Sequence, residues 1–177
     1  GIYLYSNFVI KPKEQKAFNE MYYSQKKFDE AILINNDSLY NLVLNGDGTN
    51  LGMLGMIDEY GGTNAANLAA YYSGMIYLKM NDYQNSIKYL SEFNSDDMIL
   101  GSLATGSIGD AFAELNQFED AYEYYVKASK NNNSYTSPIY LFKAGLIAMK
   151  LEKFKKAEGY FSSIKSDHSK SAEAKNI

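Results

Sequence analysis

The stretch from Leu103 to Ala128 reads LATGSIGDAFAELNQFEDAYEYYVKA, and it decides the fold. Gly109 and Phe112 share one face of a predicted helix, a polar turn follows at Asn116-Gln117, and Ala121 lies one turn into a second helix. A glycine on one helix and a small residue on the next allow two helices to approach to about 8 to 10 Å, which leaves no room for a side chain between them. Such a hairpin cannot bury its apolar face alone. The stretch therefore predicts a helical hairpin that stacks on others of its kind.

The same pattern recurs before and after this stretch. Gly74, Gly109 and Gly145 are spaced by 35 and 36 residues, which is the period of a helix-turn-helix repeat. Each glycine is followed at fixed spacings by an aromatic residue, a small residue and a large apolar residue. These in-phase positions are Tyr83, Phe118 and Phe154, then Ser86, Ala121 and Ala157, and then Leu90, Tyr125 and Phe161. The residues predicted to pack the repeats are Gly74, Ser86, Gly109, Ala121, Gly145 and Ala157.

The in-phase residues resemble the tetratricopeptide repeat (TPR) family over roughly residues 67 to 171. The resemblance is carried by Gly74-x-x-Tyr77…Asp82-Tyr83-x-x-Ser86…Leu90, by Gly109-x-x-Phe112…Gln117-Phe118-x-x-Ala121…Tyr125-x-x-Ala128, and by Ala144-Gly145…Lys153-Phe154-x-x-Ala157…Phe161. The chain departs from the family where Ala70 and Thr105 replace an early aromatic residue, and where Met98 and Asn133 replace a proline. The resemblance implies an all-α fold, an α-α superhelix of stacked helix-turn-helix hairpins.

Four segments are expected along the chain. Residues 1–12 are read as the end of a membrane-proximal or anchor segment, and residues 13–62 as a degenerate N-terminal helical hairpin. Residues 63–171 hold three TPR-like repeats, at about 67–100, 102–135 and 138–171, and residues 172–177 start a C-terminal capping helix. Within the second segment, Asp37 or Ser38 is predicted to cap a short helix, residues 45–50 are predicted to form a loop, and a helix is predicted over residues 51–60.

Composition and motifs exclude several classes of function. A net charge of −4 with scattered basic residues argues against a nucleic-acid surface. The chain has no cysteine and one histidine, His168, so it cannot assemble a catalytic triad or a zinc cluster. The Gly101–Ser107 stretch lacks the lysine of a phosphate loop, and the Asn45–Asn50 loop lacks the glycine and glutamate of a calcium loop. We therefore expect no catalytic residue, no cofactor and no metal ion.

The N-terminal residues are apolar and aromatic from Ile2 to Ile10, and Lys11, Lys13 and Lys16 follow. They are either the end of a membrane span whose beginning lies upstream, or a segment that docks on the repeats. A narrower resemblance, carried by residues 45–48, 57–63 and 108–112, is to bacterial single-pass inner-membrane proteins with a periplasmic TPR domain. It implies a membrane tether and a periplasmic location linked to secretion and chaperone machinery. The lysines favour the cytoplasmic side, so a cytoplasmic location is the alternative.

A concave groove is the predicted binding site. In a repeat stack the first helix of each hairpin lines the inner face, which places eight residues in the groove: Tyr71, Met75, Lys79, Asp110, Glu114, Phe142, Leu146 and Lys150. Apolar and Met side chains with a few charges suit an extended or helical peptide. Packing against neighbouring helices is the alternative for the apolar members. Asp110 stands out, because a carboxylate in a small apolar row requires a partner.

The leading hypothesis is a non-enzymatic scaffold or adaptor that binds a protein or peptide segment in this groove. It is tethered to a membrane and serves envelope protein export, folding or assembly. A second hypothesis is a structural module that associates through its convex face or its ends, as in a homodimer. A third, an enzyme or a carbohydrate-binding repeat protein, is disfavoured because the sequence carries no catalytic constellation.

Overall fold

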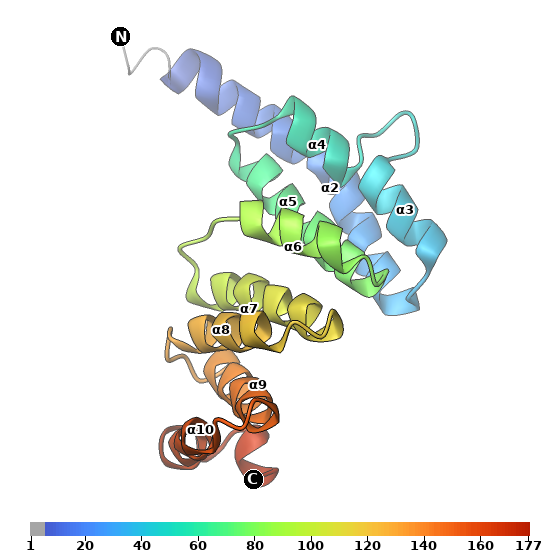
Figure 1. The fold of residues 1–177 in the computed structure, drawn as a ribbon. Coiled ribbons are helices and arrows are strands. Elements are labelled where there is room, and N and C mark those ends of the chain that lie inside the picture. Colours follow the sequence, from blue (N-terminus) through green and yellow to red (C-terminus); the bar gives the residue numbers. More distant parts are fainter. Residues whose placement is uncertain (1–5) are drawn as a thin grey trace. The chain divides into compact units, whose positions relative to one another are not determined.

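The computed structural model describes residues 6–177 and the side chains from Phe8 onward. The described part contains α-helices and no β-strand, which confirms the all-α prediction (Figure 1). The elements are η1 (Ser6–Ile10), α2 (Lys11–Ile34), α3 (Asp37–Asn45), α4 (Met53–Glu59), α5 (Asn64–Lys79), α6 (Tyr83–Glu92), α7 (Met98–Glu114), α8 (Phe118–Ser129), α9 (Thr136–Lys150), α10 (Phe154–Asp167) and η2 (Glu173–Lys175). Within residues 6–177 no helix has the length and apolar character needed to cross a bilayer. Residues 1–5 of the predicted anchor segment lie outside the described residues.

The chain divides into two compact units, Gly1–Phe93 and Asn94–Ile177. The boundary lies in the connection between α6 and α7. The first predicted repeat, which corresponds to α5 and α6, therefore belongs to the first unit. The second and third predicted repeats, α7 with α8 and α9 with α10, form the second unit.

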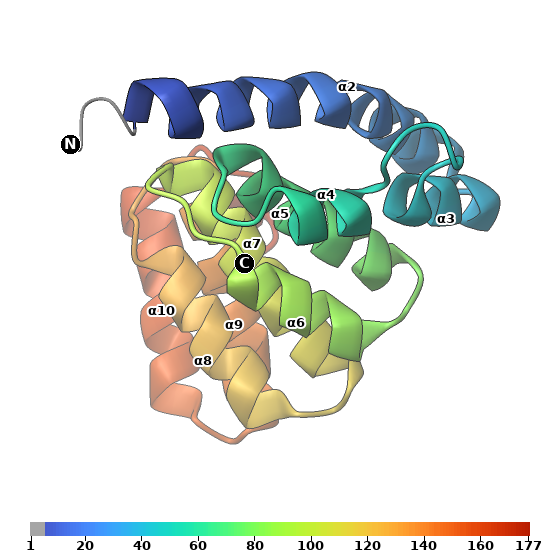
Figure 2. The same ribbon diagram turned by 90° about the horizontal axis from the view of Figure 1, so that it is seen from above.

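In the first unit the long helix α2 lies along α3, α4 and α5 (Figure 2). The Glu14 carboxylate on α2 accepts hydrogen bonds from the backbone N–H groups of Asn64 at 3.0 Å and of Ala65 at 3.2 Å. The Thr63 side chain accepts a third, from the N–H of Ala66. Since the first N–H groups of a helix have no partner within it, this shared cap fixes the start of α5 against α2.

Two helix starts in this unit differ from the sequence prediction. Asn36, and not Asp37 or Ser38, caps α3, since its side chain accepts from the N–H of Leu39 at 3.1 Å. Helix α4 begins at Met53, not at Leu51. Leu51 is held outside the helix because its carbonyl accepts a 2.6 Å hydrogen bond from the hydroxyl of Ser24 on α2.

The three repeat hairpins turn in the same way. Asn81, Asn116 and Glu152 end the first helix of each hairpin with φ of 60°, 58° and 58°. In each turn the next residue donates its N–H to the carbonyl five residues earlier, as Asp82 does to Tyr77 at 2.9 Å. This is a Schellman turn, which pairs carbonyls that a helix end leaves unsatisfied. The backbone therefore repeats with the period that the sequence indicates.

The in-phase glycines pack against the large residue sixteen positions later. A Cβ atom at Gly74 would lie 2.5 Å from Leu90, at Gly109 it would lie 2.8 Å from Tyr125, and at Gly145 it would lie 2.5 Å from Phe161. Each glycine thus faces the large in-phase residue of the second helix, whereas the sequence pattern had paired it with the small one. The second helix also approaches closely with its backbone, since a Cβ atom at Gly74 would lie 3.0 Å from the backbone nitrogen of Leu90 and one at Gly109 would lie 3.4 Å from the carbonyl oxygen of Ala121. The large side chain that covers each glycine was not part of the sequence prediction. The three small residues are buried as expected, namely Ser86, Ala121 and Ala157.

The C-terminal residues form one short turn. Where a capping helix was expected to start, the structure has the 3-10 turn η2, which packs on α9 and α10. The second unit is thus four helices in two hairpins, with α8 and α9 packed against each other between α7 and α10.

Candidate functional site

A cluster of four side chains, Asp110, Tyr125, Tyr140 and Lys143, joins the three helices α7, α8 and α9. We call it the inner polar cluster. The Tyr125 hydroxyl donates to Asp110 Oδ1 at 2.7 Å, and Lys143 Nζ donates to the same oxygen at 2.6 Å. Asp110 therefore has the partners that a carboxylate in an apolar row requires, and both belong to this chain. The side chains of Asp110 and Lys143 are 31% and 36% exposed, so the ion pair lies at the edge of the packed interior.

The two tyrosine rings form the apolar walls of this cluster. They stack with their centroids 6.3 Å apart and their planes 17° apart. Lys143 Nζ lies 5.5 Å from the centroid of Tyr125 and 5.7 Å from that of Tyr140, within the range of a cation–π interaction. Burial raises the pKa of Tyr125, and the negative charge of Asp110 raises it further. Tyr125 therefore stays protonated and keeps donating to Asp110.

The ring of Tyr140 also accounts for the lack of a side chain at Gly106, because the ring occupies the space where a Cβ atom at that position would lie. The short contact brings α9 against α7 beside the ion pair. Lys143 was not among the residues predicted from the sequence. The sequence does contain a sign of this pair. Lys143 is the one charged residue of α9 away from its last turn, and Asp110 is the one charged residue of α7 away from its last residue. Their charges are opposite and they lie about one repeat apart.

The remaining predicted groove residues of the second unit differ in exposure. Glu114 and Lys150 are exposed at the ends of α7 and α9, and Leu146 is 48% exposed on α9. Lys150 Nζ lies 4.1 Å from the ring centroid of Phe118, at the start of α8. Phe142 is half-buried and packs on Phe161 of α10, with centroids 5.9 Å apart. The structure thus brings Glu114, Leu146 and Lys150 to the surface, and places Phe142 in a hairpin contact.

The predicted groove residues of the first unit lie on α5. Tyr71 is only 8% exposed, and its ring packs on Phe93 at 5.2 Å and on Tyr72 at 5.8 Å. This arrangement is the packing role that the sequence left open for Tyr71. Met75 is half-buried and Lys79 is exposed.

The described side chains form no candidate metal centre in either unit. Among the described side chains, no three His, Cys, Asp or Glu residues gather closely enough to hold a metal ion. The Asn45–Asn50 loop is a turn, because the Asp47 carboxylate accepts from the backbone N–H groups of Asn50 at 2.7 Å and Thr49 at 2.9 Å. The hydrogen bond from the N–H of Asn50 does most to lower the pKa of Asp47, and the bond from Thr49 lowers this pKa further. Its carboxylate therefore organises the loop.

Comparison with known proteins gives one match. Residues 68–96, which span most of α5 and all of α6, match the sequence profile of the family described as tetratricopeptide repeat. No curated protein and no solved structure matches the chain. The family match supports the TPR resemblance, while the narrower resemblance to membrane-anchored periplasmic proteins finds no support in it.

Proposed function

We propose that this chain is a non-enzymatic scaffold that binds a segment of another protein. The observation that carries the proposal is the threefold recurrence of one hairpin, with the same turn and the same glycine packing, in a chain that matches the TPR family over residues 68–96. TPR domains generally bind protein partners, and repeat proteins of this kind use extended surfaces to do so.

The proposed binding surface is the exposed side of α7 and α9, marked by Glu114, Leu146 and Lys150. Both helices are the first of their hairpins, so they run in the same direction, and Glu114 and Lys150 are each the last residue of their helix. Charges of opposite sign at one end of the surface give a bound segment a fixed direction. Leu146, at 48% exposure, supplies apolar contact for such a segment.

The inner polar cluster supports this surface from within. Lys143 and Tyr125 hold Asp110 at 2.6 and 2.7 Å, which fixes the spacing of α7 and α9. A surface whose helices are already in place loses less freedom when a segment binds, and that saving increases affinity. Asp110 is therefore proposed as a positioning residue of the surface.

Site-specific photo-crosslinking tests the proposal. A photoreactive amino acid at Leu146 is expected to capture a protein partner, and Glu114→Lys in the same chain is expected to reduce that capture. The matched control places the photoreactive group at Leu33, which is 86% exposed on α2 of the first unit. Equal capture of the same protein from both positions, or capture at Leu146 that Glu114→Lys leaves unchanged, contradicts the proposed surface.

A membrane tether is the second part of the proposal. Phe8, Val9 and Ile10 are 76%, 47% and 48% exposed, and the exposed Lys11 follows them directly. Apolar side chains beside a basic residue suit the interface of an anionic bilayer. Flotation with anionic vesicles is expected to carry the chain, and a Phe8→Ser, Val9→Ser, Ile10→Ser variant is expected to stay behind. Equal flotation of both chains contradicts the tether.

The periplasmic location and the role in envelope protein export are proposals that rest on the resemblance of residues 45–48, 57–63 and 108–112 to bacterial inner-membrane proteins with a periplasmic TPR domain. Because the chain has no cysteine, a single Ser169→Cys substitution in the exposed C-terminal part gives one labelling site. A membrane-impermeant maleimide is expected to label this site in cells whose outer membrane has been opened. Labelling only after lysis places the domain in the cytoplasm and contradicts the proposal.

A further inference from the structure

An apolar groove of about 370 Å³ lies along α10, lined by residues of that helix, by Met149 of α9 and by Ile177. Its floor and walls are formed by Met149, Phe154, Ala157, Phe161 and Ile177. Phe154 is 63% exposed and Met149 is 49% exposed, although both are large and apolar. A contiguous set of such side chains at the surface marks a place where another molecule packs. The binding surface proposed on α7 and α9 does not account for Phe154 or Ile177.

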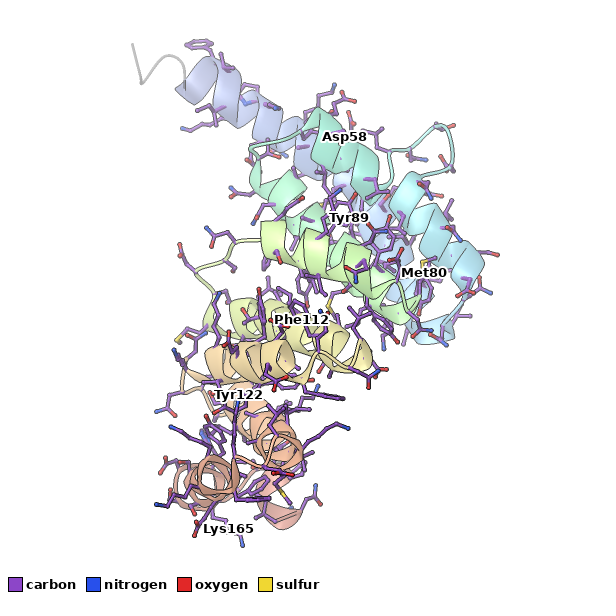
Figure 3. All side chains as sticks on the ribbon, viewed as in Figure 1. Asp58, Met80, Tyr89, Phe112, Tyr122 and Lys165 are labelled. Atoms are coloured by element: carbon purple, nitrogen blue, oxygen red, sulfur yellow. The ribbon has the colours of Figure 1, made fainter. Side chains whose placement is uncertain are left out.

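Two opposite charges border the groove on the same helix. Glu158 and Lys165 both line it, and both are exposed. Lys165 lies on the outer side of α10 (Figure 3). They are seven residues apart, which is two helical turns or about 10 Å along the axis. That separation is too long for an ion pair within the helix, yet it keeps both charges on one side of it.

We propose that this groove binds the same groove of a second copy of this chain. In a two-fold pair with the α10 helices antiparallel, the axis passes between Phe161 and Ser162, midway between Glu158 and Lys165. Glu158 then faces the partner's Lys165, and Lys165 faces the partner's Glu158. One surface thereby supplies both halves of two ion pairs, which is the self-complementarity that a two-fold interface requires. Phe154, at the start of α10, then faces the segment that follows the end of the partner's α10.

The charge pattern favours a second copy over an unrelated helix. An apolar helix of another protein can fill the groove, but it matches Glu158 and Lys165 only if it carries the opposite charges two turns apart. This chain carries that spacing on the very helix that borders the groove. Lys156 lies about 180° around the helix from Lys165, on the side away from the groove, so it takes no part in this match.

Charge reversal across the pair tests the proposal, with the molar mass of the intact chain measured by sedimentation equilibrium over a wide range of concentration. The wild-type chain is expected to approach twice 19.9 kDa as its concentration rises. Glu158→Lys places two lysines opposite each other and Lys165→Glu places two glutamates there, so each is expected to weaken self-association by about tenfold or more. An equimolar mixture of the two variants restores both ion pairs, and it is expected to form a heterodimer of wild-type strength. The double variant Glu158→Lys, Lys165→Glu is expected to associate with itself again.

The control is Lys156→Glu, which changes the net charge by the same amount as Lys165→Glu but lies on the opposite side of α10. It is expected to leave self-association unchanged, and circular dichroism checks that all variants remain folded. A wild-type chain that stays monomeric at every concentration overturns the proposal. A dimer that neither single reversal weakens, or that Lys156→Glu weakens as much as Lys165→Glu, also overturns it. Failure to recover association on mixing shows that the two charges do not face each other, and overturns the two-fold arrangement.

Discussion

Replacing Gly109 with alanine should destabilise the second unit, although alanine is the better helix former. A Cβ atom at position 109 would lie 2.8 Å from Cδ1 and Cε1 of Tyr125. That ring cannot easily move away, because its hydroxyl donates to Asp110 at 2.7 Å and it stacks on Tyr140. Overpacking a contact of this kind costs about 1 to 3 kcal/mol, while alanine in place of a helical glycine returns about 1 kcal/mol. We therefore expect a net loss of about 1 kcal/mol in the free energy of unfolding.

Gly159 provides the matched control in the same unit. It lies in α10, and apart from its chain neighbours and the backbone of its own helix, no atom lies within 4 Å of the position that its Cβ atom would occupy. Gly159→Ala should therefore raise the free energy of unfolding by about 0.5 to 1 kcal/mol. Urea unfolding of both variants, followed by circular dichroism, measures the difference in sign. If Gly109→Ala stabilises the chain as much as Gly159→Ala does, the packing explanation for the in-phase glycines is refuted.

Three further predictions concern pH and the hairpin turns. Burial raises the pKa of Tyr125 in the folded chain above its ordinary value near 10. The stability that this provides is present below about pH 10 and is lost as pH rises further, so the free energy of unfolding should fall above pH 10 and should fall less steeply in Tyr125→Phe. An equal slope in both chains, measured by urea unfolding at a series of alkaline pH values, contradicts this. Glu152 has a φ of 58°, a backbone conformation that asparagine tolerates better than glutamate. Glu152→Asn should therefore raise the free energy of unfolding by about 0.5 to 1 kcal/mol. An unchanged midpoint of urea unfolding argues against this backbone effect. Gln117 has nearly the backbone angles of Asp82, which caps α6, but makes no cap of its own, so Gln117→Asn should gain up to about 1 kcal/mol and Asp82→Ala should lose about as much. Changes of the same sign in these last two variants are inconsistent with capping.

The hairpins could be predicted from the sequence because the contacts that define them are local. Gly109 meets Tyr125 sixteen residues later, and the Schellman turn at Asn116 lies between them. Both repeat with the period of the chain, so spacing alone reveals them. The atom that fills the space over each glycine could not be predicted, since spacing does not distinguish a bare backbone approach from a covering side chain.

The candidate site was predicted only in part. Asp110 stood out as a carboxylate in an apolar row, but its ion pair with Lys143 spans 33 residues and two loops. Periodicity does not report contacts between hairpins, and it gives no sign that the chain divides after Phe93. The exposure of Leu146 and the burial of Tyr71 likewise depend on how helices pack, because both residues occupy predicted groove positions on first helices.

Amide chemical-shift mapping of the labelled chain, titrated with the protein segment recovered by crosslinking at Leu146, tests the proposed function most directly. The shifts are expected to gather on α7 and α9, with those of Glu114 and Leu146 among the largest. Shifts confined to α8 and α10, or to α2 in the first unit, would contradict it.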